Sequence, residues 1–318
     1  INYLLNFCNS FLIQSRSILI SLSLVSKSAS SNLFTLLSKS LTLPSNLLHV
    51  THRVNKNTHK LTRFAGLVKY TRRFSIIILP YYSVIGGWII KYLVQFVSGG
   101  MAQAATDGFF DNFISSPTEP IGWFLLYLGA TTIVVLSGVE KGVEKVSKIM
   151  MPILVVLTVF IAVYSLFMPG AVDGLIYYIK PDFSKFSITT VLAAMGQLFY
   201  SMSLAMGIMI TYGSYMKKDV NLESAVSQIE IFDTGIAFLA GLMIIPSVFA
   251  FSGGDQAALN QGPGLMFITL PKVFDFMPGG AIIGGLFFLL VLFAALTSSI
   301  SLMETIVSIV CDKFKWNI

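Results

Sequence analysis

Residues 195–216 read MGQLFYSMSLAMGIMITYGSYM, and this stretch decides the fold. It is long enough to span a bilayer, but residues 201–207 mix two serines and a glycine into the apolar run. Unwound backbone at membrane depth is tolerated only where protein encloses it or where it lines a water-filled cavity. Discontinuous helices of this kind hold ions and substrates in secondary transporters. The alternative is an ordinary continuous helix, since glycine is frequent in membrane helices.

The composition of the whole chain is that of an integral membrane protein. Hydrophobic residues make up 55% and charged residues 11%, and the mean hydropathy is +0.78. A spanning helix needs about 20 apolar residues. Six stretches satisfy this, and we expect an all-α polytopic protein with spans near 74–97, 121–138, 149–168, 188–215, 231–251 and 279–310.

The N-terminal part of the chain differs from the rest. The first 106 residues contain no Asp or Glu and 11 Lys or Arg, and residues 10–45 contain 12 serines. Such a composition is typical of an organellar transit peptide, of a stretch read in the wrong frame, or of unrelated sequence fused upstream. We therefore expect two parts: a basic, Ser-rich segment 1–70 without an assigned role, and a transmembrane domain 71–318.

Basic residues in the loops predict the orientation of the spans. With 74–97 running outward from the cytoplasm, eleven Lys and Arg fall in inner loops and three in outer loops. This distribution obeys the positive-inside rule. The outer loop 255–278 is long and broken by Gly and Pro, which predicts two short helices forming an extracellular lid.

Several polar residues lie within the apolar spans. Asp233 starts the span 231–251, and residues 297–299 read TSS within the last span. A carboxylate at that depth needs a partner, a cavity or an ion, although Ser and Thr also join membrane helices to one another. Oxygen ligands suit a hard cation such as sodium. The two cysteines and three histidines suggest no metal site, and the sequence has no nucleotide-binding loop or nucleophile elbow, so we do not expect an enzyme.

Five segments resemble the bacterial branch of the neurotransmitter:sodium symporters. In chain order they are YYSVIGGWIIKY (81–92), GVEKVSKIMMPIL (142–154), MGQLFYSMSLAMGIMITYGSYMKKD (195–219), GPGLMFITLPKVF (262–274) and FAALTSSISLMETIVS (293–308). The resemblance covers about 74–318 and implies the leucine-transporter-like fold of two inverted repeats, here helices three to eight. Nothing in residues 1–65 resembles the family's first helix, which supplies ligands to both of its sodium sites.

The resemblance implies a site for each ligand. The substrate site would comprise Ile78, Tyr82, Tyr200, Ser201, Ser203, Met206 and Leu302. The sodium ligands would be Ser201, Asp233, the backbone carbonyl of Ala294, Thr297 and Ser298. These apolar and amphipathic side chains, with free backbone groups beside them, favour a small hydrophobic or aromatic amino acid.

Two positions near the first sodium site depart from the family. The family usually has Asn where Asp233 stands, and chloride-dependent members have a serine where Ala237 stands. Gln197 and Asp233 match the surroundings of the family's anion site. An ionised Asp233 would supply the negative charge itself, so we expect transport without chloride. The competing hypothesis is that Asp233 carries a proton on the return step.

The sequence therefore predicts sodium-coupled amino-acid symport across the cell (plasma or inner) membrane by a multi-pass protein. The partners would be the amino acid, sodium and the lipid bilayer, with no nucleic acid and no cofactor beyond the coupling ions. The main alternative is a truncated or frameshifted symporter remnant without transport activity. A channel or a membrane scaffold is a further alternative; a pore would conduct without saturating.

Overall fold

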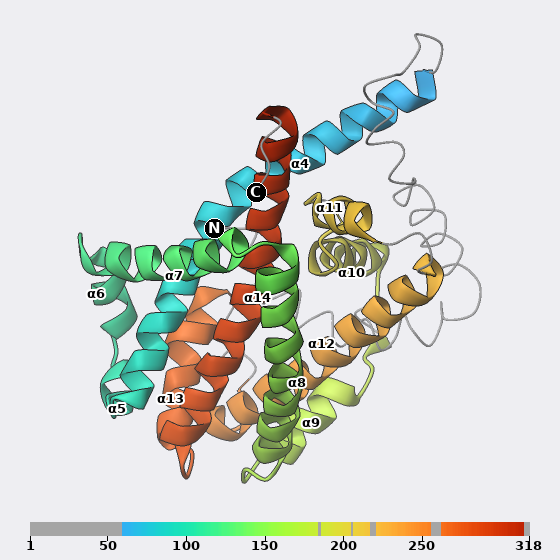
Figure 1. The fold of residues 1–318 in the computed structure, drawn as a ribbon. Helices are drawn as coiled ribbons and strands as arrows, with labels where there is room; N and C mark the ends of the chain where they lie inside the picture. Colours follow the sequence, from blue (N-terminus) through green and yellow to red (C-terminus); the bar gives the residue numbers. More distant parts are fainter. Residues whose placement is uncertain (1–58, 184–185, 205, 217–220, 256–261, 315–318) are drawn as a thin grey trace.

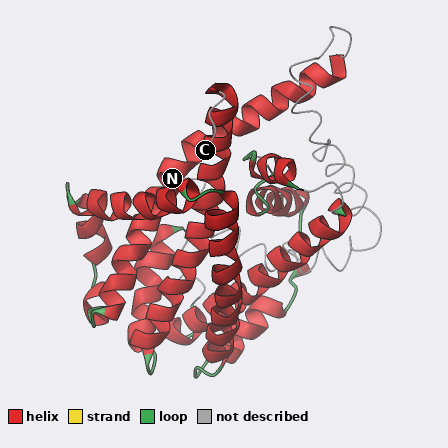
Figure 2. Ribbon diagram, in the orientation of Figure 1, coloured by secondary structure: helices red, strands yellow, loops and turns green. Residues whose placement is uncertain are grey.

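The chain forms a helical bundle with two long helices at its centre (Figure 1). The computed structural model describes residues 59–183, 186–204, 206–216, 221–255 and 262–314, and within these ranges all regular structure is helical (Figure 2). The long helices are α4 (His59–Val97), α7 (Glu119–Leu136), α8 (Lys145–Leu166), α12 (Leu222–Ser252) and α14 (Gly280–Phe314).

Five helices of the described part are long and apolar enough to cross a membrane. The sixth expected span is divided into α10 (Ile188–Ser201) and α11 (Ile208–Tyr215). The prediction of an all-α protein with one discontinuous span is confirmed. Three short helices were not predicted: α5 (Met101–Ala104), α6 (Phe109–Ser115) and α9 (Ala171–Ile179).

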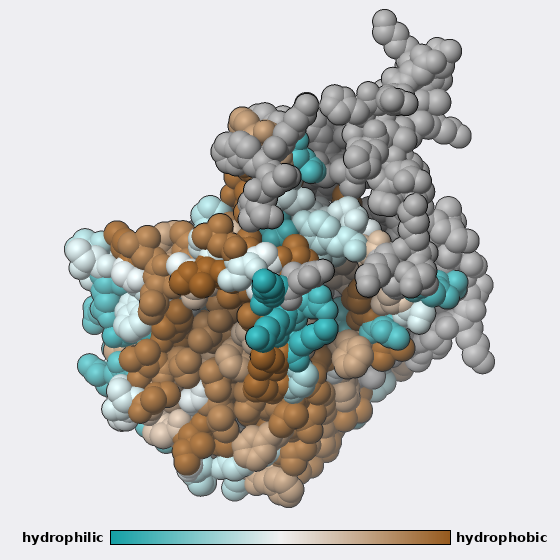
Figure 3. All heavy atoms as spheres, viewed as in Figure 1, coloured by the Kyte–Doolittle hydropathy of each residue, from teal (hydrophilic) through white to brown (hydrophobic). Residues whose placement is uncertain are grey.

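Large apolar side chains cover the outside of the bundle. Ile133 on α7 and Val156 on α8 are 69% and 67% exposed, and many other apolar residues of these helices are also exposed. Figure 3 shows the resulting hydrophobic face as a continuous brown area. Exposed apolar surface on this scale indicates contact with lipid rather than water. The chain is a multi-pass membrane protein.

The core is built around α4 and α14, which pack along each other. The helix α7 packs on both of them, and α8 joins α14 to α12. The contact between α7 and α14 contains the buried hydroxyls of Tyr127 and Ser299, whose oxygens lie 2.7 Å apart. Aromatic rings in tilted, edge and stacked contact fill the outer half of the core: Tyr92, Phe267, Phe274, Phe287 and Phe288.

The helix α12 begins about nine residues before the span predicted from hydropathy. The Asn221 side chain accepts hydrogen bonds from the backbone N–H groups of Glu223 and Ser224, at 3.0 and 3.3 Å, and so caps the helix. Asp233 consequently lies about three turns inside the helix rather than at its start. Its carboxylate is half-buried.

The predicted boundary between residues 70 and 71 falls inside α4, which is helical from His59. The division of the chain into two parts at this boundary remains a prediction. Residues 1–58 lie outside the described residues.

The described residues of the outer segment before α14 form one helical piece, where two short helices were predicted over residues 255–278. A wide turn at Leu265–Thr269 continues into α13 (Leu270–Phe276), while residues 256–261 lie outside the described part. This piece is buried in the outer aromatic core because its apolar side chains follow helical spacing. The Tyr92 hydroxyl donates to the Phe267 carbonyl at 2.7 Å, and the Tyr164 hydroxyl donates to the Pro278 carbonyl.

An ion pair on the outer surface also holds α13. Lys272 donates to the carboxylate of Asp107, and this contact lowers the pKa of Asp107 below its usual value. Because the folded-state pKa is lowered, the pair stabilises the fold above the ordinary pKa and loses its effect as pH falls through the lowered one. We expect proteolytic cleavage near α13 to become faster as pH falls through this range. In the Asp107→Asn variant this increase should disappear; an unchanged increase would contradict the assignment.

Gly87 allows α4 and α7 to approach closely. A Cβ at Gly87 would lie 2.7 Å from the backbone nitrogen of Phe124, whereas a Cβ at Gly129 would meet nothing within 4 Å. Backbone cannot move aside as a side chain can, so we expect Gly87→Ala to destabilise the protein by about 1–3 kcal/mol. Gly129→Ala is the matched control and should leave the thermal unfolding temperature unchanged. Equal unfolding temperatures for both variants would contradict the close approach of α4 to α7 at Gly87.

Candidate functional site

The break between α10 and α11 is a defined turn. The helix α10 ends at Ser201 and α11 begins at Ile208, with Ser203 at φ 54° and Gly207 at φ 77°. The Leu204 N–H donates to the Phe199 carbonyl at 3.1 Å. A non-glycine residue with positive φ costs free energy, and such residues gather at functional sites. The continuous helix considered from sequence is therefore wrong.

Ser75 on α4 anchors this turn. Its hydroxyl donates to the Met206 carbonyl at 2.5 Å, and the serine is completely buried. The sequence analysis missed Ser75. Spacing offered a signal, because Ser75 lies one turn before Ile78 and two turns before Tyr82, on the same face of α4.

The side chains predicted for the substrate site gather around the break. Leu79, Met206, Ile208 and Leu302 are buried together, and the partly buried side chains of Ile78, Tyr82 and Tyr200 pack against them. The structure thus brings together Ile78, Tyr82, Tyr200, Met206 and Leu302, five of the seven predicted residues. They come from α4, α10, the turn and α14. The cluster offers an apolar surface with two tyrosine hydroxyls.

The hydroxyls of α14 lie beside this cluster. Thr297 and Ser298 both donate to the Ala294 carbonyl, at 3.0 and 3.1 Å. The Tyr82 hydroxyl lies close to Ser298. Three predicted sodium ligands, Ala294, Thr297 and Ser298, therefore share one turn of α14. They supply two hydroxyl oxygens and one carbonyl oxygen. An oxygen set of this kind fits a hard cation.

The remaining predicted ligands meet at the end of α10. The Ser201 hydroxyl donates to Asp233 Oδ1 at 2.5 Å. Gln197 lies four residues before Ser201 and Ala237 four residues after Asp233, so each lies one helical turn from this pair. The neighbourhood contains a carboxylate, a hydroxyl and an amide. It can hold a cation with the carboxylate as the source of negative charge.

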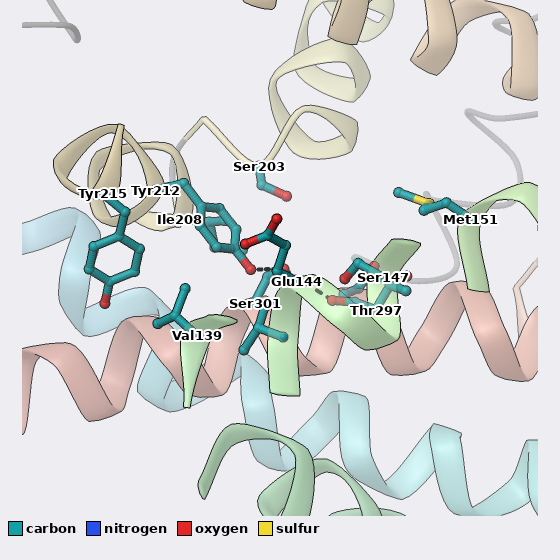
Figure 4. A pocket seen from close by; sticks show the side chains of 12 residues that line it. Val139, Glu144, Ser147, Met151, Ser203, Ile208, Tyr212, Tyr215, Thr297 and Ser301 are labelled. Atoms are coloured by element: carbon teal, nitrogen blue, oxygen red, sulfur yellow. Dashed lines mark hydrogen bonds between the residues drawn. The ribbon is translucent and has the colours of Figure 1, made fainter. Parts of the chain in front are cut away.

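A cavity of about 470 Å³ extends the site along α8 and α11. Ser203, Thr297 and Ser298 line the cavity, together with five side chains of the segment that leads into α8: Val139, Val143, Glu144, Ser147 and Met151. Figure 4 shows Ser203 from the turn and Thr297 from α14 on the walls of this cavity. Ser203 thus borders the cavity, while the Ser201–Asp233 pair is formed by α10 and α12.

Two hydrogen bonds join α11 to α14 at the wall of the cavity, which Tyr212, Tyr215 and Ser301 line. The Tyr212 and Ser301 hydroxyl oxygens lie 2.8 Å apart, and the Tyr215 hydroxyl donates to Glu304 Oε1 at 2.7 Å. Glu304 is 5% exposed. The sequence analysis did not single out this glutamate, although a carboxylate within an apolar span is itself a signal.

Comparison with known proteins identifies the class. The fold is that of a membrane protein built around a discontinuous helix. The model of the sodium:neurotransmitter symporter family matches residues 114–318. The chain belongs to that family, which consists of transporters rather than enzymes.

Two sodium-dependent transporters are similar to this chain in sequence. The uncharacterized sodium-dependent transporter YhdH of Bacillus subtilis is 39% identical over 235 residues, which is 73% of this chain and 51% of YhdH. An uncharacterized sodium-dependent transporter of Haemophilus influenzae is 36% identical over 82% of this chain and 57% of its own length. The chain spans about half the length of the curated relatives it matches.

A solved structure has the same fold. The crystal structure of MhsT in complex with L-phenylalanine matches with a TM-score of 0.67 and 34% sequence identity. The match covers 98% of this chain and 64% of the MhsT chain. The leucine-transporter-like fold implied by the five sequence segments is confirmed.

Proposed function

We propose that this chain takes part in sodium-coupled symport of a small hydrophobic or aromatic amino acid, by alternating access around the broken helix. The observation that carries the proposal is the cluster of five predicted substrate residues directly beside the break. An apolar cluster beside a break in a helix suits the apolar side chain of an amino acid. MhsT, the structural relative, is described in complex with L-phenylalanine.

Two oxygen groups support coupling to sodium. The first is the turn of α14 formed by Ala294, Thr297 and Ser298, and the second is the Ser201–Asp233 pair. Both lie next to residues of the proposed substrate site, since Tyr82 lies close to Ser298 and Tyr200 precedes Ser201. Sodium at either place would stabilise the geometry that binds the amino acid.

Uptake by the reconstituted 318-residue chain tests the proposal. Proteoliposomes containing the chain should accumulate radiolabelled L-phenylalanine when an inward sodium gradient is applied. A choline gradient of equal size should drive no accumulation, and uptake should saturate with phenylalanine. Absence of uptake in both gradients would favour the symporter remnant, and uptake that never saturates would favour a channel.

Asp233 and Ala237 predict that this transport does not need chloride. The carboxylate supplies the negative charge beside the cation, and alanine lacks the hydroxyl that would help to hold an anion. Replacing chloride by gluconate should leave the uptake rate within about twofold of its original value, because no charge is lost from the site. Collapse of uptake in gluconate would refute this prediction.

A proton on Asp233 is the competing explanation of the same substitution. It predicts uptake that depends on internal pH at a constant sodium gradient. A rate that does not vary with pH would leave the carboxylate as a fixed charge.

A further inference from the structure

One carboxylate in the cavity has no role in the proposed substrate and sodium sites. Among the described residues that line the cavity, Glu144 is the one acidic residue, and the same cavity is bordered by Thr297 and Ser298. Figure 4 shows the Glu144 carboxylate within the cavity, in the space between Ser203 and Tyr212. Its side chain is 52% exposed, so water and ions reach it.

The backbone holds Glu144 in this position. Residues Val139–Glu144 form a wide π-helical turn that precedes α8, and Gly138 enters it with φ 82°. A Cβ at Gly142 would lie 2.1 Å from the Val134 carbonyl oxygen, so only glycine allows this turn to pack against the end of α7. π-Helical turns are rare and are frequent at functional sites.

The cavity wall between Glu144 and the α14 hydroxyls is rich in oxygen. Ser147, Ser203 and Ser301 line it, together with the hydroxyl of Tyr212. A sodium ion that leaves Thr297 and Ser298 through the cavity therefore meets hydroxyl oxygens and then one full negative charge. Hydroxyl and carboxylate oxygens are the ligands that hard cations prefer.

Lys148 neutralises Glu144 in this structure. Its ammonium donates to Glu144 Oε1 at 2.5 Å, one turn further along α8, and its own side chain is 73% exposed. Exposed ion pairs of this spacing are weak. A sodium ion arriving in the cavity can therefore displace the lysine, and the lysine can return when the ion leaves.

We propose that Glu144 is a transient sodium site, with Lys148 as its exchangeable partner. The site lies on the route from the hydroxyls of Thr297 and Ser298 to the cytoplasmic side of the membrane, as predicted by the distribution of Lys and Arg residues. The inference rests on the proposed sodium-coupled function. It adds a residue to the ion route, which the substrate and sodium assignments above do not contain. A purely structural role for the ion pair makes a different prediction.

The rate of sodium release separates the two roles. The experiment follows dissociation of ²²Na⁺ from the purified full chain in lipid nanodiscs after dilution into unlabelled buffer. Glu144→Gln should slow release about tenfold, because the departing ion loses an attractive charge. Lys148→Met should accelerate release by about threefold, because the competing cation is gone. Glu144→Asp keeps the charge and should restore release close to the original rate.

Matched controls make each outcome decisive. Lys145→Met removes a neighbouring lysine of the same helix and should leave the release rate unchanged. If the pair only stabilises α8, Glu144→Gln and Lys148→Met lose the same contact and should change the rate in the same direction, which would overturn the inference. If the unsubstituted chain binds no sodium, the proposed function fails, and the inference fails with it. Thermal unfolding of each variant confirms that it is folded.

Discussion

Asp233→Asn should weaken the dependence of phenylalanine binding on sodium by about 100-fold. The substitution removes a full negative charge while keeping the shape and an oxygen that accepts the hydrogen bond from Ser201. Two unit charges about 4 Å apart interact by about 4 kcal/mol at the effective dielectric of partly exposed protein sites, and solvent screening reduces the measured effect. The measurement is the sodium concentration at half-maximal binding in nanodiscs.

Two further variants make this result specific. Glu223→Gln removes a carboxylate from the exposed first turn of the same helix and should leave the sodium dependence unchanged. Asp233→Asn combined with Ala237→Ser should regain sodium dependence in chloride and lose it again in gluconate, because the added hydroxyl helps to hold an anion. An unchanged sodium dependence in Asp233→Asn would remove this carboxylate from the site.

Thr297→Val should weaken the sodium dependence by about 10–100-fold. Valine has nearly the same shape as threonine, so the packing of α14 is kept while one oxygen is lost. A hydrogen bond or ligand contact to a charged group contributes about 1.5–3 kcal/mol, which gives the expected range. Ser298→Ala should act in the same direction and should also disturb Tyr82, which lies close to Ser298.

The same helix offers a close control. Thr305 also donates to a carbonyl of its own helix, that of Ser301, at 2.9 Å, but lies two turns beyond the proposed ligands. Thr305→Val should therefore leave the sodium dependence unchanged. Equal effects of Thr297→Val and Thr305→Val would mean that α14 responds to lost hydroxyls in general and holds no ion at residue 297.

The sequence predicted the parts of the fold that local pattern determines. The break near residues 201–207 was visible because serines and a glycine interrupt an apolar run, and the structure places Ser203 and Gly207 at positive φ there. The grouping of Ile78, Tyr82 and Leu302 came from resemblance of separate segments. It could not have come from pattern alone, since these residues lie on helices more than 200 positions apart.

What the sequence did not predict depends on contacts between distant helices. Ser75 reads as an ordinary serine until α4 brings it to the Met206 carbonyl. Glu304 reads as the charged end of a span until Tyr215 reaches it. The early start of α12 depends on the side-chain cap at Asn221, which a hydropathy average does not register. The expected pair of outer helices reflected the Gly and Pro residues of that loop, yet the described residues form one packed piece because its apolar side chains are buried.

The most direct measurement is equilibrium binding of radiolabelled L-phenylalanine to the purified 318-residue chain in lipid nanodiscs, with sodium replaced stepwise by potassium at constant ionic strength. We expect saturable binding that increases with sodium and disappears in potassium alone. Binding that is equal in sodium and potassium, or no saturable binding in either, would contradict a sodium-coupled amino-acid site in this chain.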